Sequence, residues 1–243
     1  MARRPAHHPP MAGHIHRPTS DDPGYLYAGG SVGGFGCRDF YVAQLPRPQA
    51  VDIIRRNHYS RRVVNNSYVH LGVYLGGALV GVLQFGYALN PHRASFVVAN
   101  TGTMEYLELN RMWMDDSAPR NSESRAIAYA VRYIKRALPQ VRWIQSYADE
   151  RCGRWGVVYQ AANFLYVGSH TTEFYELDGE TYHKLLLTAH RKSGTRGPYL
   201  QANLDRAVRR KLRQFRYVFF VKPKYLRDLR LKVQPYPKPP PEE

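Results

Sequence analysis

The sequence predicts an α+β protein in which helices flank a mixed, mostly antiparallel sheet. Three features predict this class: a strand hairpin at 68–86, a strand–loop–helix unit at 104–138, and a strand followed by a helix at 141–163. Short runs rich in β-branched and aromatic residues are typical of strands. Apolar residues at helical spacing indicate amphipathic helices. The order of these elements therefore predicts one sheet with helices packed against it.

The hairpin has the clearest pattern. Its strands, at 68–75 and 78–86, are joined by Gly76 and Gly77, and a glycine pair favours a tight turn. The run from 71 to 89 carries no charge and approaches the length of a membrane span. The central glycines and the flanking β-branched residues favour two strands instead, so we expect no membrane insertion.

The strand–loop–helix unit follows the hairpin. Residues 104–114 alternate in hydrophobicity and predict a central strand, and a polar loop at 117–125 leads into a helix that Asn121 or Ser122 can cap. The pattern also predicts helices at 49–56 and 156–163. The other expected strands are 141–147, which runs on to Asp149, and 171–177, 181–187 and 215–220.

Three segments differ in composition. Residues 1–36 are rich in Pro, His and Gly and contain few aliphatic residues, so we expect a disordered N-terminal tail. Residues 37–189 contain most of the predicted elements and form the expected catalytic domain. Residues 190–243 are dense in Lys and Arg, which predicts a basic C-terminal extension, and their Pro-rich end at 235–241 is expected to be disordered.

The charge of the chain restricts its partners. Its 35 Lys and Arg against 19 Asp and Glu give a net charge of +16. A soluble domain needs a net charge of only roughly 2–8, so the excess indicates a polyanionic partner such as nucleic acid. Cys37 and Cys152 lack the spacing of a metal site, and no apolar stretch follows the basic N-terminal residues. We therefore expect a cytoplasmic protein with reduced thiols.

The C-terminal extension interleaves basic and aromatic residues. Because cations neutralise phosphates and aromatic rings stack on bases, we expect this segment to bind DNA. A helix over 205–213 with its charges in solvent is the alternative. The predicted DNA-binding residues are Arg206, Arg209, Arg210, Lys211, Arg213 and Arg216.

The start of the helix near residue 122 is the expected site of a phosphate-bearing cofactor. The first N–H groups of a helix are unpaired and its dipole is positive there, which favours a pyrophosphate. The order of elements is also how acyltransferases of the GNAT superfamily build a splayed cleft, which implies an acyl-CoA-type donor. Glu123 and Arg125 stand where that superfamily has glycines, so a plain amphipathic helix is the alternative. The expected cofactor-binding residues are Arg120, Asn121, Ser122, Ser124 and Arg125.

Side chains capable of proton transfer occur at three places. His58 and Tyr59 precede the hairpin, and Asp149 ends a strand, where open sheets carry functional groups. His58 and Asp149 suit one of two roles. They could cooperate as a general base, or they could both ligate one divalent metal. Tyr159 lies where GNAT proteins often carry a general acid. The structural alternatives are a loop histidine, a capping aspartate and a packed ring.

Three stretches, 57–60, 67–73 and 106–111, together resemble the Mom family of bacteriophage DNA-modification proteins, with the sequences NHYS, SYVHLGV and YLELNR. The resemblance spans roughly 51–188. It implies a GNAT-like enzyme that adds a carbamoylmethyl-type (acetamido) group to N6 of adenine in double-stranded DNA and so protects phage DNA from host restriction. It also implies an iron-type divalent metal and a place in the host bacterial cytoplasm. The residues that the resemblance places in functional positions are His58, Tyr59, Ser124, Asp149 and Tyr159.

Two other functions stay open from the sequence. An acetyl-CoA-dependent N-acetyltransferase of a protein or small amine needs no DNA, and the net charge of +16 disfavours it. A non-catalytic DNA-binding protein on a GNAT scaffold needs no proton-transfer groups, and the polar residues at 57–60 disfavour it. The sequence does not identify the group donor, the DNA sequence around the target base or the oligomeric state. A homodimer is one of the states left open.

Overall fold

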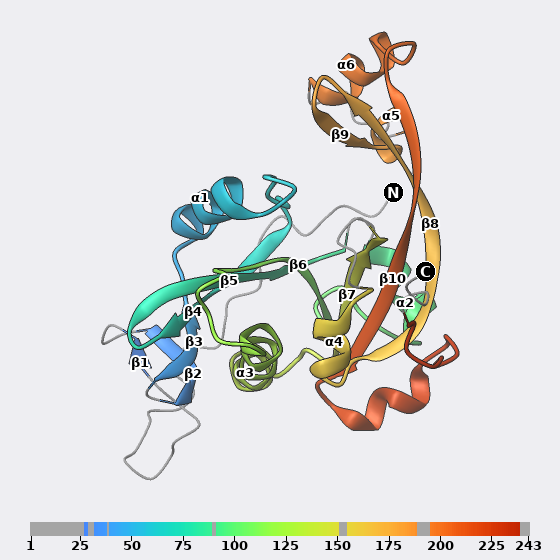
Figure 1. The fold of residues 1–243 in the computed structure, drawn as a ribbon. Coiled ribbons are helices and arrows are strands. Elements are labelled where there is room, and N and C mark those ends of the chain that lie inside the picture. The colour runs from blue at the N-terminus through green and yellow to red at the C-terminus, as the bar shows by residue number, and fades with distance from the viewer. Residues whose placement is uncertain are drawn as a thin grey trace.

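One mixed sheet organises the molecule. A computed structural model describes residues 27–28, 32–37, 39–88, 91–150, 155–188 and 195–238. Within them ten strands follow the spatial order β1-β2-β3-β4-β5-β6-β7-β10-β8-β9 (Figure 1), and all neighbours are antiparallel except β6 and β7. The predicted α+β class is confirmed. The strands are β1 (Tyr27–Ala28), β2 (Val32–Cys37), β3 (Phe40–Gln44), β4 (Ser67–Leu75), β5 (Ala78–Gly86), β6 (Tyr106–Met114), β7 (Trp143–Asp149), β8 (Leu165–Leu177), β9 (Glu180–His183) and β10 (Val208–Phe220).

Helices cover both faces of the sheet, with α1 and α3 on opposite sides (Figure 1). The predicted helices at 49–56, after the polar loop and at 156–163 are confirmed as α1, α3 and α4. In the described part of the chain, no helix is long and apolar enough to span a membrane. The helices are α1 (Arg47–Asn57), α2 (Ala94–Val97), α3 (Ser122–Ala137), α4 (Val157–Ala161), α5 (Leu185–Thr188) and α6 (Arg196–Ala202), with short 3₁₀ helices η1 (Pro91–Arg93) and η3 (Pro223–Asp228).

The predicted hairpin is confirmed as β4 and β5. Gly76 and Gly77 form its turn with φ angles of 55° and 86°, a left-handed conformation that glycine adopts without steric cost. Leu71 and Leu83 of the two strands are register partners and fully buried. The hairpin is therefore a central part of the sheet.

The sheet divides between β6 and β7. Their parallel register ends at the pair Glu108 and Gln145. Beyond it, β6 stays beside β5 as far as Met114, whereas β7 stays beside β10 as far as Asp149. The divergence opens space at the ends of two central strands, where sheets of this kind bind ligands.

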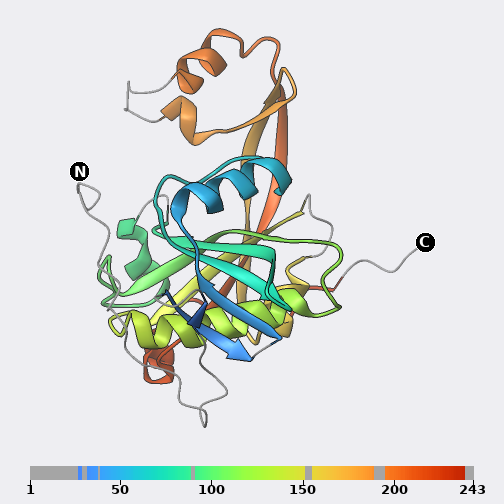
Figure 2. The same cartoon turned by 90° about the vertical axis from the view of Figure 1, so that its left-hand side faces the viewer.

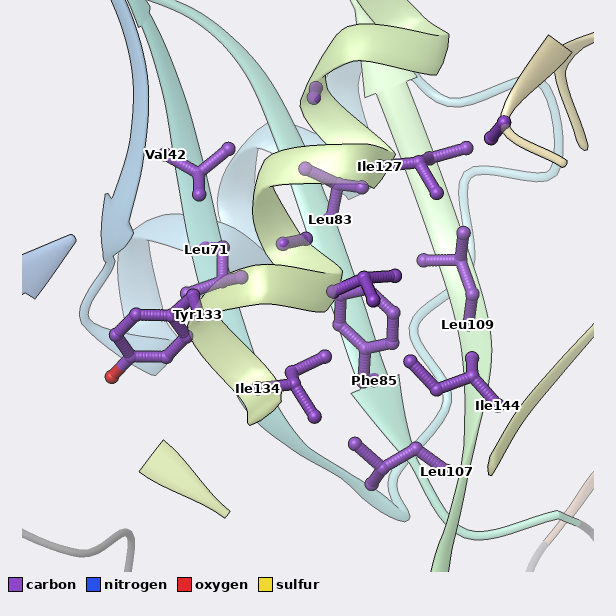
Figure 3. Close-up of a cluster of buried hydrophobic side chains, with 14 of the residues drawn as sticks. Val42, Leu71, Leu83, Phe85, Leu107, Leu109, Ile127, Tyr133, Ile134 and Ile144 are labelled. Carbon is purple, nitrogen blue, oxygen red and sulfur yellow. The ribbon is translucent and has the colours of Figure 1, made fainter. Parts of the chain in front are cut away.

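The main core lies between α3 and one face of the sheet (Figure 3). Ile127 and Ile134 of α3 are fully buried, and Figure 3 shows them in one cluster with Leu83, Phe85 and Leu107 of the sheet. Each such aliphatic side chain contributes roughly 1.5–3 kcal/mol when it leaves water. This burial holds α3, and with it the predicted cofactor loop, against the strands that form the cleft.

The C-terminal half differs from the prediction. β10 is one strand of 13 residues, inserted between β7 and β8, so the solvated helix proposed over 205–213 is wrong from residue 208 onward. β8 is likewise a single strand of 13 residues. The strand expected at 181–187 is shorter, because β9 ends at His183 and the chain continues as α5. The basic segment is thus part of the sheet.

The outer halves of β8 and β10 leave the sheet as a two-stranded ribbon that carries β9, α5 and α6 (Figure 2). We call residues 171–188 and 195–213 the lobe. Leu177, Tyr182 and Leu200 form its own small core. The lobe rises from the sheet on the same side as α1 (Figure 1), so these two elements flank the region above the divergence of β6 and β7.

Both ends of the described chain are more structured than predicted. β2 pairs with β3, although most of β2 falls within the predicted tail, so the tail ends earlier than residue 36. Residues 1–26 and Cys152 lie outside the described residues. The Tyr236 hydroxyl donates to the Phe164 carbonyl at 2.9 Å, so the disorder expected at 235–241 does not hold for residues 235–238.

Candidate active site

A cleft of about 2190 Å³ opens where β6 and β7 diverge. It reaches from the start of α3 to the lobe, and its volume exceeds the roughly 300–1,000 Å³ of a pocket for one small ligand. The cleft therefore has room for two reactants. The predicted site residues that line it are His58, Tyr59, Arg120, Asn121, Ser124, Asp149, Tyr159 and Arg216.

The remaining predicted site residues do not line the cleft. Ser122 is buried, and its hydroxyl donates to the Pro119 carbonyl at 2.6 Å. Arg125 is exposed, and its guanidinium lies 4.7 Å from the centre of the Phe40 ring. At the start of α3, a ligand in the cleft therefore meets Arg120 and Ser124. The predicted DNA-binding residues that also lie outside the cleft are Arg206, Arg209, Arg210, Lys211 and Arg213.

The start of α3 has no side-chain cap. Asn121 occupies the N-cap position with φ 70° and ψ 9°, a left-handed conformation that Asn tolerates better than most residues. Its side chain makes no capping hydrogen bond, which corrects the expected cap. The Ser124 hydroxyl donates to the Asn121 carbonyl at 3.1 Å. The Ser122 N–H donates to the Pro119 carbonyl at 3.1 Å, whereas no side chain caps the N–H groups that follow it, and these suit an anion.

His58 is held in one orientation at the end of α1. It is 7% exposed, and its Nδ1 accepts the Ser60 N–H at 3.1 Å and lies 2.8 Å from Ser60 Oγ. Burial, and then the positive charge of Arg111, lowers the pKa of His58 to about 4. The ring is therefore uncharged at neutral pH, and acceptance at Nδ1 places its proton on Nε2. This arrangement favours His58 as a hydrogen-bond donor over the predicted base.

Tyr59 and Tyr159 have different surroundings in the same cleft. Tyr59 is 60% exposed, and its ring centre lies 4.3 Å from that of His58. An exposed ring offers a face on which a planar ligand stacks. Tyr159 is 9% exposed and lies between the rings of Phe164 and Tyr217, at 5.8 and 5.4 Å. Packing against these two rings, the structural alternative named for Tyr159, therefore explains much of the burial of its side chain.

Asp149 ends β7 at the cleft, where the sequence predicted it. It is 7% exposed and is the register partner of Gln214 in β10. Among the described residues, no group of three or more His, Cys, Asp or Glu is placed to hold a metal ion. That part of the chain therefore offers no third His, Cys, Asp or Glu ligand to complete the predicted metal site of His58 and Asp149.

Glu108 is a candidate site residue that sequence reasoning missed. It accepts hydrogen bonds from Gln145 Nε2 at 2.8 Å and from Asn110 Nδ2 at 3.2 Å. Burial raises the pKa of Glu108 to about 7, although these bonds and the charges of Arg111 and Arg216 act in the opposite direction. A carboxyl group whose pKa is raised by burial and that lies in a cleft is a candidate for a functional position. The available signal was an acidic residue in the middle of a central strand.

A bulge in β6 brings Arg111 into the same cleft. The register with β5 skips Asn110, between Leu109 and Arg111. Such a bulge changes the direction of the side chains that follow it. Arg111 Nε donates to the Arg62 carbonyl at 2.8 Å, which ties β6 to the loop that carries His58.

Glu108→Gln is expected to stabilise the protein at alkaline pH. The pKa of about 7 lies above the ordinary value of 4.5, so the folded chain holds this proton more tightly than the unfolded chain. Stability is then lost as pH rises from about 4.5 to about 7. Because Gln carries no charge, we expect Tm to rise by roughly 3–5 °C at alkaline pH and to change little near pH 4.5. Calorimetry at both pH values checks this, and an equal change at both would contradict it.

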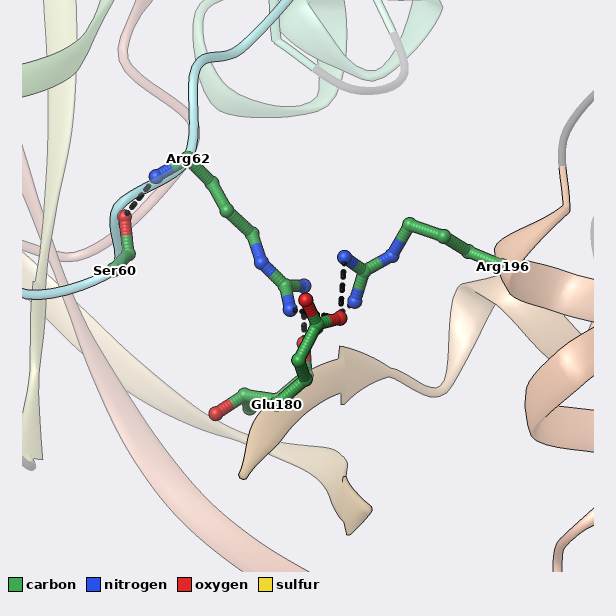
Figure 4. Close-up of polar contacts among 5 residues, drawn as sticks. Ser60, Arg62, Glu180 and Arg196 are labelled. Carbon is green, nitrogen blue, oxygen red and sulfur yellow. Dashed lines mark hydrogen bonds and ion pairs between the residues drawn. The ribbon is translucent and has the colours of Figure 1, made fainter. Parts of the chain in front are cut away.

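An ion-pair network joins the loop after α1 to the lobe (Figure 4). Glu180 pairs with Arg62 at 3.0 Å and with Arg196 at 2.9 Å, and Arg196 also donates to the Thr181 carbonyl at 3.2 Å. Both guanidinium groups lie over the Tyr182 ring, at 5.7 and 4.3 Å from its centre. Each exposed ion pair contributes little by itself. Together these contacts connect the two sides of the cleft.

Most of the predicted DNA-binding arginines are paired with nearby carboxylates. Such exposed ion pairs are weak, so a polyanion can compete with the carboxylates for these arginines. Each carboxylate nevertheless offsets part of the positive charge that the polyanion meets. Arg216 lies in the cleft instead, where its Nε donates to the Tyr147 hydroxyl at 2.9 Å. The ion pairs are Arg206 with Asp178 at 2.6 Å, Arg210 with Glu176 at 3.2 Å, Arg213 with Glu150 at 2.9 Å, and Arg209 with Glu173.

Several solved structures similar to this chain are acetyltransferases. One is Arabidopsis thaliana NAA60, with a TM-score of 0.48 and 11% identity, covering 74% of this chain and 97% of that one. Another is the ribosomal-protein-S5-alanine acetyltransferase from Vibrio fischeri, with a TM-score of 0.45 and 10% identity, covering 77% of this chain and 96% of that one.

Sequence comparison gives a closer relation. The model of the Mom protein family matches residues 39–238. The chain is also 53% identical over 212 residues to the methylcarbamoylase mom of Escherichia phage Mu, covering 86% of this chain and 88% of that protein. The resemblance seen in 57–60, 67–73 and 106–111 is confirmed by these matches. The chain therefore belongs to the Mom protein family.

Proposed function

We propose that this chain is a transferase that adds a carbamoylmethyl-type (acetamido) group to N6 of adenine in double-stranded DNA. Acting in the host bacterial cytoplasm, it protects phage DNA from restriction enzymes. The observation that carries the proposal is the 53% identity, over 88% of its length, to a phage protein named a methylcarbamoylase. The cleft lined by Asp149 and Glu108 supports a function that includes chemistry.

The reaction requires an extruded base and a proton acceptor. Extrusion of adenine from the duplex costs a few kcal/mol, and stacking on the exposed Tyr59 ring offsets part of that cost. N6 is a weak nucleophile because its lone pair is conjugated into the purine ring. A carboxylate that takes its proton during transfer is therefore needed, and the buried Asp149 is our candidate.

The donor is proposed to be of the acyl-CoA type, with its phosphates at the start of α3. Because the product is joined to N6 through a methylene carbon, the bond that breaks is the one between that carbon and the donor's leaving group, not a thioester C–S bond. Arg120 and Ser124 line the cleft there, and the positive end of the helix dipole favours the pyrophosphate. Glu123 lines the cleft at the same place, and its carboxylate repels phosphate. The donor therefore depends on Arg120 for charge compensation at this end of the cleft.

DNA contacts are proposed at the rim of the cleft as well as on the basic segment of β10. Arg61 and Arg93 are exposed, line the cleft, and have no ion pair in the described part of the chain. An unpaired guanidinium offers its whole charge to a phosphate, whereas Arg209 and Arg210 each share theirs with a carboxylate. The rim therefore presents the stronger local attraction.

Arg61→Ala combined with Arg93→Ala is expected to weaken duplex binding more than Arg209→Ala combined with Arg210→Ala. Each phosphate that the protein no longer neutralises lowers the log–log salt slope by about 0.9, so the rim pair should lower it by about 2. The paired arginines should lower it by less than about 1, because their carboxylates already offset them. Fluorescence anisotropy with a duplex at several salt concentrations measures both slopes. A larger decrease from the second pair would move the interface onto β10.

Expression of the protein is expected to make plasmid DNA resistant to enzymes with adenine in their recognition sites. A bulky group on N6 lies in the major groove and blocks readout of the base there. Plasmid from cells that make the wild-type protein is digested beside plasmid from cells without it. Complete digestion of both by several such enzymes would contradict the proposed function.

A further inference from the structure

Glu108 and Gln145 form an incomplete hydrogen-bonding pair at the floor of the cleft. They are the last register partners before β6 and β7 diverge, and both line the cleft. Gln145 is 4% exposed, and its Nε2 donates to Glu108 Oε2 at 2.8 Å. Its Oε1 is buried, and in the described part of the chain it has no hydrogen-bond partner.

A buried amide oxygen that has no partner in the described residues, in a side chain that lines the cleft, suits a hydrogen-bond donor from a ligand. Leaving such an acceptor unpaired is unfavourable, and most buried polar atoms are paired. Exchanging the two ends of the Gln145 amide removes the bond to Glu108 and leaves an NH₂ group unpaired instead. The orientation that keeps the bond therefore presents an acceptor.

Glu108 presents a second acceptor beside the first. Asn110 Nδ2 donates to Glu108 Oε1 at 3.2 Å, and each carboxylate oxygen has a further lone pair. The ionisable groups facing Glu108 are Arg111 and Tyr106 of β6, Tyr147 of β7 and Arg216 of β10. The arginines favour the ionised carboxylate, which is the stronger acceptor.

We infer that Glu108 and Gln145 are the subsite for the exocyclic amino group of the target base, an inference that rests on the proposed function. One N–H of the amine donates to Gln145 Oε1 and the other donates to the Glu108 carboxylate. Both bonds move electron density toward the amine nitrogen, which strengthens a weak nucleophile before any proton is transferred. When N6 bonds to the incoming carbon it becomes tetrahedral, so the N–H that had been donated to Glu108 turns out of the plane of the base and Asp149 takes its proton.

The pair determines which bases fit. Adenine has an amino group with two N–H donors, whereas a carbonyl oxygen in the same place would face two acceptors. A site that hydrogen-bonds an N–H rejects the analogue without it by up to about 10⁴-fold. The subsite therefore selects an amino base. Gln84 is a matched control, because its amide is also buried and unpaired but does not line the cleft.

The inference is tested by calorimetric titration of the full chain with 2′-deoxyadenosine and with purine 2′-deoxyriboside, which lacks the amino group. The wild-type protein should bind the first at least about tenfold more tightly. Gln145→Leu should remove this preference and Gln84→Leu should keep it. Equal affinities in the wild type, or a preference that survives Gln145→Leu, would overturn the subsite, as would no binding of deoxyadenosine at millimolar concentration.

A pH series adds a readout that a merely structural role would not change. In the wild type the preference for deoxyadenosine should grow about three- to tenfold from pH 6 to pH 8 as Glu108 ionises. In Glu108→Gln it should be flat. A wild-type preference independent of pH would remove Glu108 from the subsite.

This test does not depend on the donor or on DNA modification. Nucleoside discrimination without modified DNA would contradict the proposed function and leave an amino-base subsite. Modified DNA without nucleoside discrimination would contradict the subsite and leave the proposed function.

Discussion

Asp149→Asn is expected to abolish adenine modification while DNA binding and Tm stay close to wild type. Asn has nearly the same shape as Asp, so the end of β7 should keep its packing, but an amide cannot take a proton from N6. Loss of a general base typically lowers a rate by about 10²–10⁴-fold. Asp149 is buried where it lines the cleft. Because an exposed carboxylate does not reach this buried position, we expect none to take over the role of Asp149.

Asp116→Asn is the matched control for this change. Asp116 also lines the cleft, but it is exposed and belongs to the loop before α3. The Asp116→Asn variant should modify DNA as the wild type does. His58→Ala and the double change with Asp149→Asn test whether the two residues act as one unit, in which case the double variant costs little more than either single one. Near-normal modification by Asp149→Asn would reduce the residue to a structural role.

Gly86→Ala is expected to destabilise the fold strongly. A Cβ at this position would lie 2.1 Å from the Asn66 carbonyl oxygen and 2.6 Å from Ser67 Cα, and neither backbone atom is the flexible end of a side chain. Gly86 is the register partner of Ser67 at the base of the hairpin, so relief of the clash must part β4 from β5. Overpacking typically costs about 1–3 kcal/mol and more where backbone must move. We expect about 3 kcal/mol or more, measured by urea unfolding.

Gly77→Ala separates this clash from the general cost of replacing a glycine. Gly77 lies in the same hairpin with φ 86°, and nothing lies within 4 Å of its added Cβ. Only the strain of a left-handed alanine remains, which is about 1–2 kcal/mol. Equal destabilisation by the two changes would mean that the close approach of Gly86 to residues 66–67 does not control the hairpin.

The N-terminal half of the fold could be predicted because its burial is periodic. Ile127 and Ile134 lie on one face of α3, and the glycine pair at 76–77 fixes the hairpin. The first half of β10 could not be predicted, because the ribbon has solvent on both faces and its residues from Val208 to Lys211 are all exposed. A strand without a buried face shows no alternation, and its charges then resemble those of a solvated helix.

The site could be predicted in part. His58, Tyr59 and Asp149 were predicted because polar residues at the ends of elements are visible in the sequence, and all three line the cleft, whereas their roles stay predictions. The pair of Glu108 and Gln145 could not be found, because it depends on the parallel register of β6 and β7. The ion pairing of the basic segment likewise depends on the register between β8 and β10, which the sequence does not reveal.

Mass analysis of nucleosides from plasmid DNA tests the central claim most directly. Cells that express the wild-type chain should yield a deoxyadenosine heavier by one carbamoylmethyl group in place of a hydrogen, and cells that express Asp149→Asn should yield only ordinary deoxyadenosine. Deoxyadenosine of ordinary mass throughout the wild-type sample, from cells shown to contain the folded protein, would contradict the account.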